Sequence, residues 1–328
     1  MRALVRRLLQ ELDREDINWV QESVAFEFLA IACLLNAAIA NGWEANIAHL
    51  PPGVRIDSWW GFRQKWYCME KSGKFLQTPK VDSIGPFSEG MAAVIIGNKW
   101  GFIDRTGKMV IQPQFDGAVR FSQGLAVVKI HDKWGYIDKT GKMVIPPQFD
   151  YTYDFSEGMA FVLENKKFGY IDKTGQIVIP AQFRDANQFS EGLALVQQMD
   201  MKWGYINKSG KFVIPAQFRW GKDFSDGLAG VQQSDGKWGY IDKTGKFIIP
   251  AQFESVGEFS EGLARVRKDN KEGFIDKTGK CVIQPYVIQP QFYEVGPFID
   301  GIAEVTFIDS EKIGYIDKSG KYIWQPQN

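Results

Sequence analysis

The sequence predicts a mainly β protein, built as a tandem array of three-stranded meander repeats that follows an α-helical N-terminal segment. The stretch WGYIDKTGKMVIPPQFDYTYDFSEG at residues 134–158 returns in varied form from Trp66 to the C-terminus, mostly at spacings of 34 or 35 residues. A glycine recurs at the same point of each copy, as a backbone requirement would demand. Residues 1–58 lack the pattern and have helical periodicity instead. Self-similarity at such a period indicates a repeat architecture.

Residues 1–58 are expected to form helices that cap the array or dock a partner. Their first apolar stripe has the spacing of one helix face. Residues 24–40 are apolar almost all round but include Glu27 and Asn36. This run is shorter than the span of about 20 residues that crosses a membrane, so we expect a buried helix, with a membrane anchor as the alternative. The proposed docking residues are Leu4, Leu8, Phe26 and Leu29.

Residues 59–328 are expected to form the array, and each copy is interpreted as three short strands. The first strand is W-G-Y-I-D, and the turn D-K-T-G-K leads to the second. The Asp can bond the backbone two residues on, and the Gly supplies a positive φ. A proline follows the second strand, where we expect pairing to stop or reach an edge. After a loop, F-S-E-G leads to the third strand, G-L-A-x-V.

The two ends of the array depart from the pattern. The first copy, from Trp66, is degenerate, as terminal repeats often are. The last interval is 41 residues long because V-I-Q-P occurs twice, at 282–285 and 287–290, and the following turn is longer. Eight W-G-type hairpins but seven G-L-A-x-V strands can be counted. A strand from residues 54–62 is expected to supply the missing one.

The chain resembles the WG-repeat (KWG) family of bacterial proteins. The resemblance is carried by K-W-G-Y-I-D-K-T-G-K, P-x-Q-F and F-S-E-G-L-A-x-V, and it covers residues 65–328, about four fifths of the chain. It implies a repetitive β structure that serves as a binding or scaffolding module, without common catalytic residues. A propeller-like ring and an open β superhelix both remain compatible with it. The departures are Tyr67, Phe168, Asn207, Glu272 and Ile313.

Composition argues against several functional classes. The formal net charge is zero and the pI about 6.8, so no global field favours nucleic acid or an anionic membrane. Three distant cysteines and two histidines indicate neither a disulfide framework nor a metal site. No arrangement of a histidine and a nucleophile suggests catalysis. We therefore expect a protein without enzymatic activity, cofactor or metal. Since no signal peptide pattern is present, we also expect it to be cytoplasmic.

Two features of the repeat could bind a partner. The aromatic residues could form platforms for sugars or bases, although a core role is favoured because short strands need large side chains to bury enough surface. The D-K-T-G-K turns are basic, and six of the seven F-S-E-G turns are acidic before Gly. If the two turn types lie on opposite rims, one rim is basic and the other acidic; ordinary solvation of the turns is the simpler alternative. The candidate basic rim consists of Arg105, Lys108, Lys139, Lys142, Lys173, Lys208, Lys211, Lys243, Lys246, Lys277 and Lys280.

The expected function is a protein–protein interaction scaffold whose most favoured partner is another protein. Two alternatives stay open at this point. One is a glycan- or nucleic-acid-binding repeat module, with nucleic acid bound by the basic rim. The other is an array attached to the membrane by residues 24–40, which the composition disfavours. The sequence assigns no small molecule.

Overall fold

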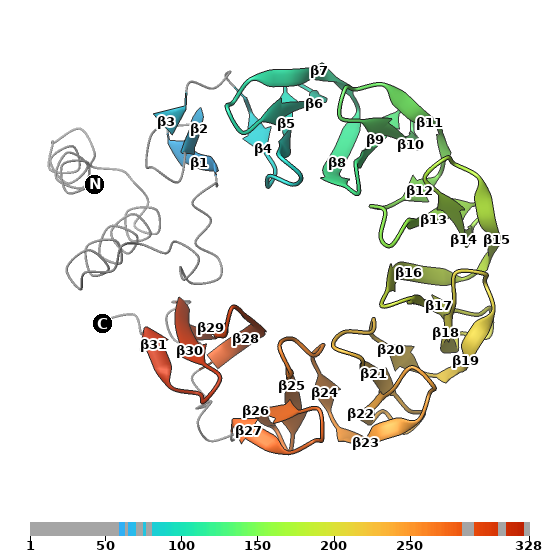
Figure 1. Cartoon of the computed structure of the whole chain (residues 1–328), viewed down its shortest axis with the longest axis vertical. Helices are drawn as coiled ribbons and strands as arrows, with labels where there is room; N and C mark the ends of the chain where they lie inside the picture. Colours follow the sequence, from blue (N-terminus) through green and yellow to red (C-terminus); the bar gives the residue numbers. More distant parts are fainter. Residues whose placement is uncertain are drawn as a thin grey trace, which may run out of the picture.

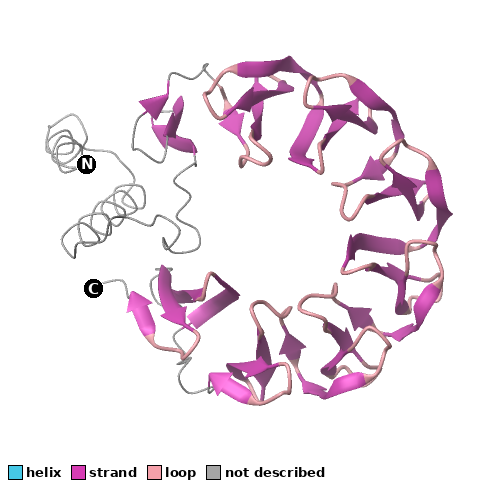
Figure 2. Ribbon diagram, in the orientation of Figure 1, coloured by secondary structure: helices cyan, strands magenta, loops and turns pink. Residues whose placement is uncertain are grey.

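The computed structural model describes residues 81–283, 292–307 and 313–324, together with strands at 59–62, 65–69 and 75–76. Its described elements are all β-strands (Figure 2). The helices predicted within residues 1–58, with the candidate docking residues Leu4, Leu8, Phe26 and Leu29, lie outside the described residues. Within the described residues, no helix has the length and apolar character needed to cross a membrane.

The described part of the chain contains eight antiparallel sheets, which we number 1 to 8 in chain order. Sheets 1 to 4 are β1 (Trp59–Phe62), β2 (Lys65–Met69), β3 (Phe75–Leu76); β4 (Ser83–Ile84), β5 (Met91–Ile96), β6 (Lys99–Asp104), β7 (Met109–Phe115); β8 (Gly117–Ser122), β9 (Leu125–Ile130), β10 (Lys133–Asp138), β11 (Met143–Phe149); and β12 (Tyr151–Thr152), β13 (Met159–Glu164), β14 (Lys167–Asp172), β15 (Ile177–Phe183). Sheets 5 to 8 are β16 (Asp185–Ser190), β17 (Leu193–Gln197), β18 (Trp203–Ile206), β19 (Phe212–Phe218); β20 (Trp220–Gly221), β21 (Ala229–Gln232), β22 (Trp238–Ile241), β23 (Phe247–Phe253); β24 (Ser255–Val256), β25 (Leu263–Lys268), β26 (Lys271–Asp276), β27 (Cys281–Ile283); and β28 (Phe292–Ile299), β29 (Ile302–Phe307), β30 (Ile313–Asp317), β31 (Tyr322–Trp324).

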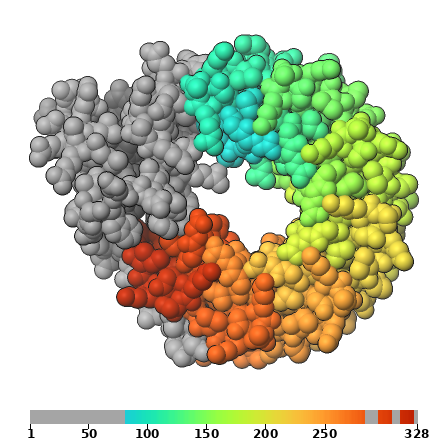
Figure 3. All heavy atoms as spheres, in the orientation of Figure 1, coloured from blue at the N-terminus to red at the C-terminus, as the bar shows by residue number. Residues whose placement is uncertain are grey.

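The sheets follow one another around a central opening in a propeller-like arrangement (Figures 1 and 3). In each of sheets 2 to 8, the first strand lies nearest the opening and the fourth lies at the circumference (Figure 1). The chain then crosses from the outer strand of one sheet to the inner strand of the next. Sheets 3 to 7 therefore each pack two faces against their neighbours in sequence, as in other repeat arrays.

The prediction of three strands per repeat was wrong: the described repeats from sheet 2 onward each have four. The missing strand lies between the P-x-Q-F and F-S-E-G motifs, in the stretch interpreted as a loop. In sheet 3 it is β8, which pairs antiparallel with β9. Four-stranded units of this kind are the building blocks of propellers.

The expectation that pairing stops at the proline was also too strict. Pro146 and Pro147 lie inside the outer strand β11. Between the pairs Tyr136–Ile145 and Trp134–Phe149 the register shifts, so that this strand bulges at the prolines. Because β11 is an edge strand, the missing N–H groups of the prolines cost no ladder bond to a further strand.

This bulge explains the glycine that follows Trp in the W-G pair. A Cβ placed on Gly135 would lie 2.5 Å from the carbonyl oxygen of Ile145 and 2.7 Å from the nitrogen of Pro147. The same backbone approach occurs at Gly101, Gly169, Gly204 and Gly239. The outer strand thus crosses so close to the W-G strand that only glycine fits.

The ends and spacings of the array have simple structural causes. The predicted strand from residues 54–62 is confirmed as β1 (Trp59–Phe62), which pairs with β2. Turns of two residues join β9 to β10 and β13 to β14, whereas sheets 5 and 6 have longer turns at residues 198–202 and 233–237. Trp134 pairs with Lys129, five residues earlier, whereas Trp203 pairs with Gln197, six residues earlier. The 35-residue spacings therefore reflect one extra residue between the paired positions in each of these two sheets.

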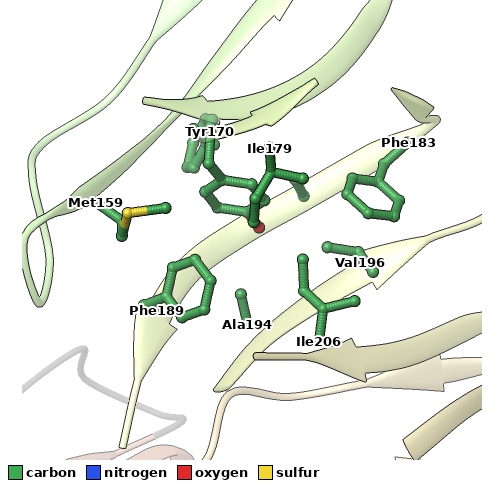
Figure 4. Packing of buried hydrophobic residues seen from close by; sticks show 10 residues of the cluster. Met159, Tyr170, Ile179, Phe183, Phe189, Ala194, Val196 and Ile206 are labelled. Atoms are coloured by element: carbon green, nitrogen blue, oxygen red, sulfur yellow. The ribbon is translucent and has the colours of Figure 1, made fainter. Parts of the chain in front are cut away.

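The hydrophobic core lies between adjacent sheets. Figure 4 shows one such layer, where Met159, Tyr170 and Ile179 of sheet 4 pack against Phe189 and Val196 of sheet 5. The prediction that the repeated aromatic side chains form the core is confirmed for Tyr and Phe, whereas Trp100, Trp134 and Trp238 are only partly buried and pack against the core clusters. The fully buried aromatic side chains are Tyr136, Tyr170, Tyr205, Tyr240, Phe102, Phe121, Phe155, Phe189, Phe224, Phe259, Phe274 and Phe298.

Candidate functional site: the latch face

The two turn types of the repeat lie on the same face of the ring. In sheet 3 the F-S-x-G turn joins β8 to β9 and the D-K-T-G turn joins β10 to β11. Because β8 to β11 are successive antiparallel neighbours, alternate turns lie at the same end of the sheet. The hypothesis of a basic rim opposite an acidic rim is therefore wrong. The unpredicted inner strand changes the strand count from odd to even and brings the two turn types together.

Each D-K-T-G turn is held by its Asp. In sheet 3, Oδ1 of Asp138 accepts hydrogen bonds from the backbone N–H and the hydroxyl of Thr140 and from the N–H of Lys142. The hydrogen bond from the Thr140 hydroxyl is the main cause that holds the pKa of the Asp138 carboxyl below its usual value. Asn207 accepts the same three bonds in sheet 5. These carboxylates therefore have a structural role in their turns.

Acid should weaken the turns. A carboxyl whose pKa is lowered by folding stabilises the protein above its unfolded pKa of about 3.9, and this contribution is lost as pH falls through the folded pKa. Asn207 shows that an amide makes the same hydrogen bonds without titrating. We therefore expect an asparagine variant to lose unfolding free energy less steeply than the unchanged chain between about pH 4 and 2. The variant carries Asp138→Asn, Asp172→Asn, Asp242→Asn and Asp276→Asn. Denaturant unfolding across this pH range measures how steeply the unfolding free energy of each of the two proteins falls with pH. Equal slopes would assign the acid sensitivity to other carboxyls.

Three contacts join the F-S-E-G turn of each of sheets 2 to 7 to the following sheet, and we call them together the latch. Oγ of Ser156 donates to the carbonyl of Phe189 at 2.7 Å. The Glu157 carboxylate accepts from the N–H of Gly192 at 3.0 Å and lies 3.2 Å from Nζ of Lys208. Nζ of Lys208 also donates to the backbone carbonyl of Glu157 at 2.8 Å. Equivalent bonds recur around the ring, so we call this side the latch face.

From sheet 3 onward, the latch uses the first basic residue of the D-K-T-G-K turn. Nζ of Lys139 lies 3.2 Å from the Glu89 carboxylate, and Lys243 and Lys277 pair in the same way with the acids of the preceding sheets. Lys173 donates to the carbonyl of Gln123, the one non-acidic member of the series. These lysines are thus engaged within the protein. The last described turn adds Lys318, which pairs with Glu261.

The second basic residue of each turn remains exposed. The described residues offer these ammonium groups no ion pair and no side-chain hydrogen bond, and each lies at the outer side of the latch face, where its turn enters the outermost strand. Arg105, by contrast, lies over the Phe87 ring at 5.9 Å. We call the exposed set the outer lysines: Lys108, Lys142, Lys211, Lys246, Lys280 and Lys321. The candidate basic rim therefore divides into residues that join sheets and residues that are free to contact another molecule.

Sequence reasoning missed the pairing of the two charge series because the partners lie far apart in the chain. Lys139 and Glu89 are 50 residues apart, more than one repeat. A signal was available, since nearly every repeat carries one acid in F-S-E-G and a basic residue in D-K-T-G-K. One acid and at least one basic residue at fixed positions of these repeats are consistent with intramolecular pairs.

The inner segments around the central opening also hold charged groups. Nε of Arg120 donates to Asp154 at 2.9 Å across sheets 3 and 4, and Nδ2 of Asn187 donates to Asp223 at 3.0 Å. Burial raises the pKa of both carboxyls. In the described ranges no three His, Cys, Asp or Glu residues come together as a possible metal site.

Comparisons with known proteins agree with the repeat organisation. A family model described as "WG containing repeat" matches residues 68–100, 100–134, 134–168, 168–200, 203–238, 238–271 and 286–307. No curated protein matches the chain in sequence.

The comparison with solved structures found, among others, one of similar fold at low sequence identity, and two at lower TM-scores. A eukaryotic initiation factor is 10% identical, with a TM-score of 0.57 over 81% of this chain and 83% of that chain. BamB from Moraxella catarrhalis is 9% identical, with a TM-score of 0.44 over 79% of this chain and 95% of that chain. The WD40 β-propeller domain of Doa1 is 14% identical, with a TM-score of 0.34 over 69% of this chain and 88% of that chain.

Proposed function

Because the chain belongs to the WG containing repeat family, we propose that it is a non-enzymatic, cytoplasmic protein–protein interaction scaffold that docks an acidic surface of its partner on the latch face. A rigid array of equivalent units presents one broad surface, and such surfaces suit recognition of other macromolecules. The absence of a histidine–nucleophile pair from the sequence and the structural use of the turn carboxylates support a role without catalysis.

The outer lysines carry the proposal. Their neighbours in the same turns have internal partners, so the positive charge of the first series is balanced. The second series adds six exposed ammonium groups on one face, and their positive charge is moderated by the Asp of each turn except at Lys211, whose turn has Asn207. Complementary charge steers association and fixes the register of a partner. An acidic protein surface is therefore the partner chemistry that this face fits best.

Charge reversal tests this proposal. In the triple variant Lys142→Glu, Lys211→Glu and Lys246→Glu, we expect the partner's affinity to fall at least about tenfold, since exposed pairs contribute about 0.5 kcal/mol each and three make roughly one factor of ten. Nuclease-treated capture from the native host, followed by titration of the recovered protein, measures the loss.

The matched control changes three exposed lysines on the opposite face: Lys166, Lys167 and Lys271. This control alters the net charge equally, so a global charge effect would weaken both variants. Unchanged binding by the latch-face variant would remove the outer lysines from the site. Binding that survives only without nuclease, and that weakens steeply with salt, would favour nucleic acid as the ligand.

A further inference from the structure

Sheets 5 and 6 contain two copies of the same turn on the face opposite the latches, which we call the crossover face. In the turn at 198–202, Met201 N–H donates to the Gln198 carbonyl and the Lys202 N–H to Asp200 Oδ1. The turn at 233–237 repeats both bonds with Gly236 and Lys237 as the donors. The two turns therefore provide a comparison within one chain, with the same backbone and different side chains.

The side chains of these turns differ where the backbone does not. The second turn has Ser234, whose small polar side chain suits contact with solvent, and Gly236, which readily adopts a positive φ. The first turn has Met199 and Met201, exposed by 51% and 57%, and Met201 adopts a φ of 68° where the other turn uses glycine. Exposing two large apolar side chains and forcing one into a left-handed conformation does not help this turn to fold. Such outliers are typical of functional surfaces.

A tryptophan extends the same patch. Trp220, the first residue of β20, is 52% exposed and packs edge-on against Trp203 at 5.4 Å. Trp203 follows Met201 by two residues, so Trp220 contacts the strand that the methionine turn leads into, where sheets 5 and 6 meet. At the equivalent position, sheets 3 and 7 have Gly117 and Ser255.

The charge beside the patch is reversed relative to the other repeats. The residue after P-x-Q-F lies at the crossover between sheets, and its N–H pairs in each case with the end of the next second strand. In four sheets this residue is acidic and bonds the neighbouring turn or a basic side chain: Asp82, Asp116, Asp150 and Glu254. In sheets 5 and 6 it is Arg184 and Arg219, both exposed and without an ion pair among the described residues.

We infer that Met199, Met201 and Trp220, flanked by Arg184 and Arg219, form a docking site for an acidic amphipathic segment of another protein. Exposed methionine and tryptophan side chains adapt to large apolar side chains of a partner. The two arginines then contact carboxylates that border the apolar side chains of that segment. This site is separate from the outer lysines, which lie on the opposite face.

The site is tested with variants in which each of its residues is replaced by the residue that another repeat of this chain has at the equivalent position. Met199→Ser with Met201→Gly converts the first turn into the second, and Trp220→Ser copies Ser255. Thermal unfolding of the methionine variant should occur at or above the wild-type temperature because both replacements already serve in the equivalent turn, whereas Trp220→Ser loses the ring contact with Trp203 and should unfold at a somewhat lower temperature. Arg184→Asp with Arg219→Asp copies the acidic residues of sheets 3 and 4.

The probe is a random library of 16-residue peptides displayed on phage and selected on the full chain. We expect recovered peptides to be rich in Asp and Glu and in Leu, Phe or Trp. Synthetic copies should bind at least tenfold more weakly to the methionine and tryptophan variants and to the arginine variant, while the latch-face triple variant binds them as wild type does. Retained binding by that triple variant separates this site from the proposed lysine surface.

Three results would overturn the inference. One is recovery of no peptides, or of peptides without both acidic and apolar residues. Another is equal binding of the recovered peptides by wild type and the copied-repeat variants. The third is concentration-dependent dimerisation that those variants abolish, seen by sedimentation, which would assign the patch to a second copy of this chain.

Discussion

Replacing Gly135 by alanine is expected to cost about 3 kcal/mol or more of unfolding free energy. The added Cβ would lie 2.5 Å from the Ile145 carbonyl oxygen, 2.7 Å from the Pro147 nitrogen and 2.8 Å from the Pro146 carbonyl carbon. All three atoms are backbone, so no side chain can rotate away to relieve the overlap. The outer strand must separate from the W-G strand of sheet 3. Denaturant unfolding monitored by tryptophan fluorescence measures the cost.

Gly158→Ala is the matched control for this prediction. Gly158 has a φ of 83°, and a Cβ there meets nothing within 4 Å. Gly158→Ala should therefore lower the unfolding free energy only by the cost of holding an alanine in a left-handed backbone conformation, about 1–2 kcal/mol. A cost at Gly135 no greater than the cost at Gly158 would contradict the steric explanation for the W-G pair.

Replacing Phe189 by alanine is expected to destabilise the array by about 3–5 kcal/mol. Phe189 is 1% exposed and lies in the core layer between sheets 4 and 5. Its ring packs edge-on against Tyr170 at a centroid distance of 5.0 Å. Hydrogen exchange of the backbone amides should show the largest loss of protection in sheets 4 and 5, because contacts in a repeat array join nearest neighbours.

Ser190→Ala provides the control at the adjacent position. It removes the bond from Oγ to the Phe224 carbonyl, 2.7 Å long, but leaves the apolar layer intact. We expect a loss of about 1 kcal/mol. If Phe189→Ala accelerates exchange equally in all sheets, the array unfolds as a single cooperative unit and the nearest-neighbour description is wrong.

The elements that every repeat needs in the same chemical form are predictable from the sequence. The D-K-T-G hairpin is such an element, because its Asp and Gly have fixed backbone tasks. The recurring pattern therefore assigns Asp138 and Gly141 to a turn, and Tyr136 and Phe155 to the core. The structure confirms these assignments.

The inner strand could not be predicted because its residues are not repeated. In sheet 3 the residues before Phe121 are Gly-Ala-Val-Arg, whereas those before Phe189 in sheet 5 are Asp-Ala-Asn-Gln. This strand borders the central opening (Figure 1). A half-exposed edge strand does not require the same side chains in every repeat. A three-stranded repeat would place the two turn types at opposite ends of the sheet, which is why the hypothesis of two rims separates Lys139 from Glu89 although they are in contact.

The latch has a consequence for how such a chain changes over generations. Ser156, Glu157 and Lys208 connect one repeat to the next through the same atoms that connect other adjacent pairs. Unequal crossing-over between two copies of the gene segment would therefore join repeats that already fit each other. Whole repeats can be gained or lost in single events, and each event would change the circumference of the ring and the width of its opening.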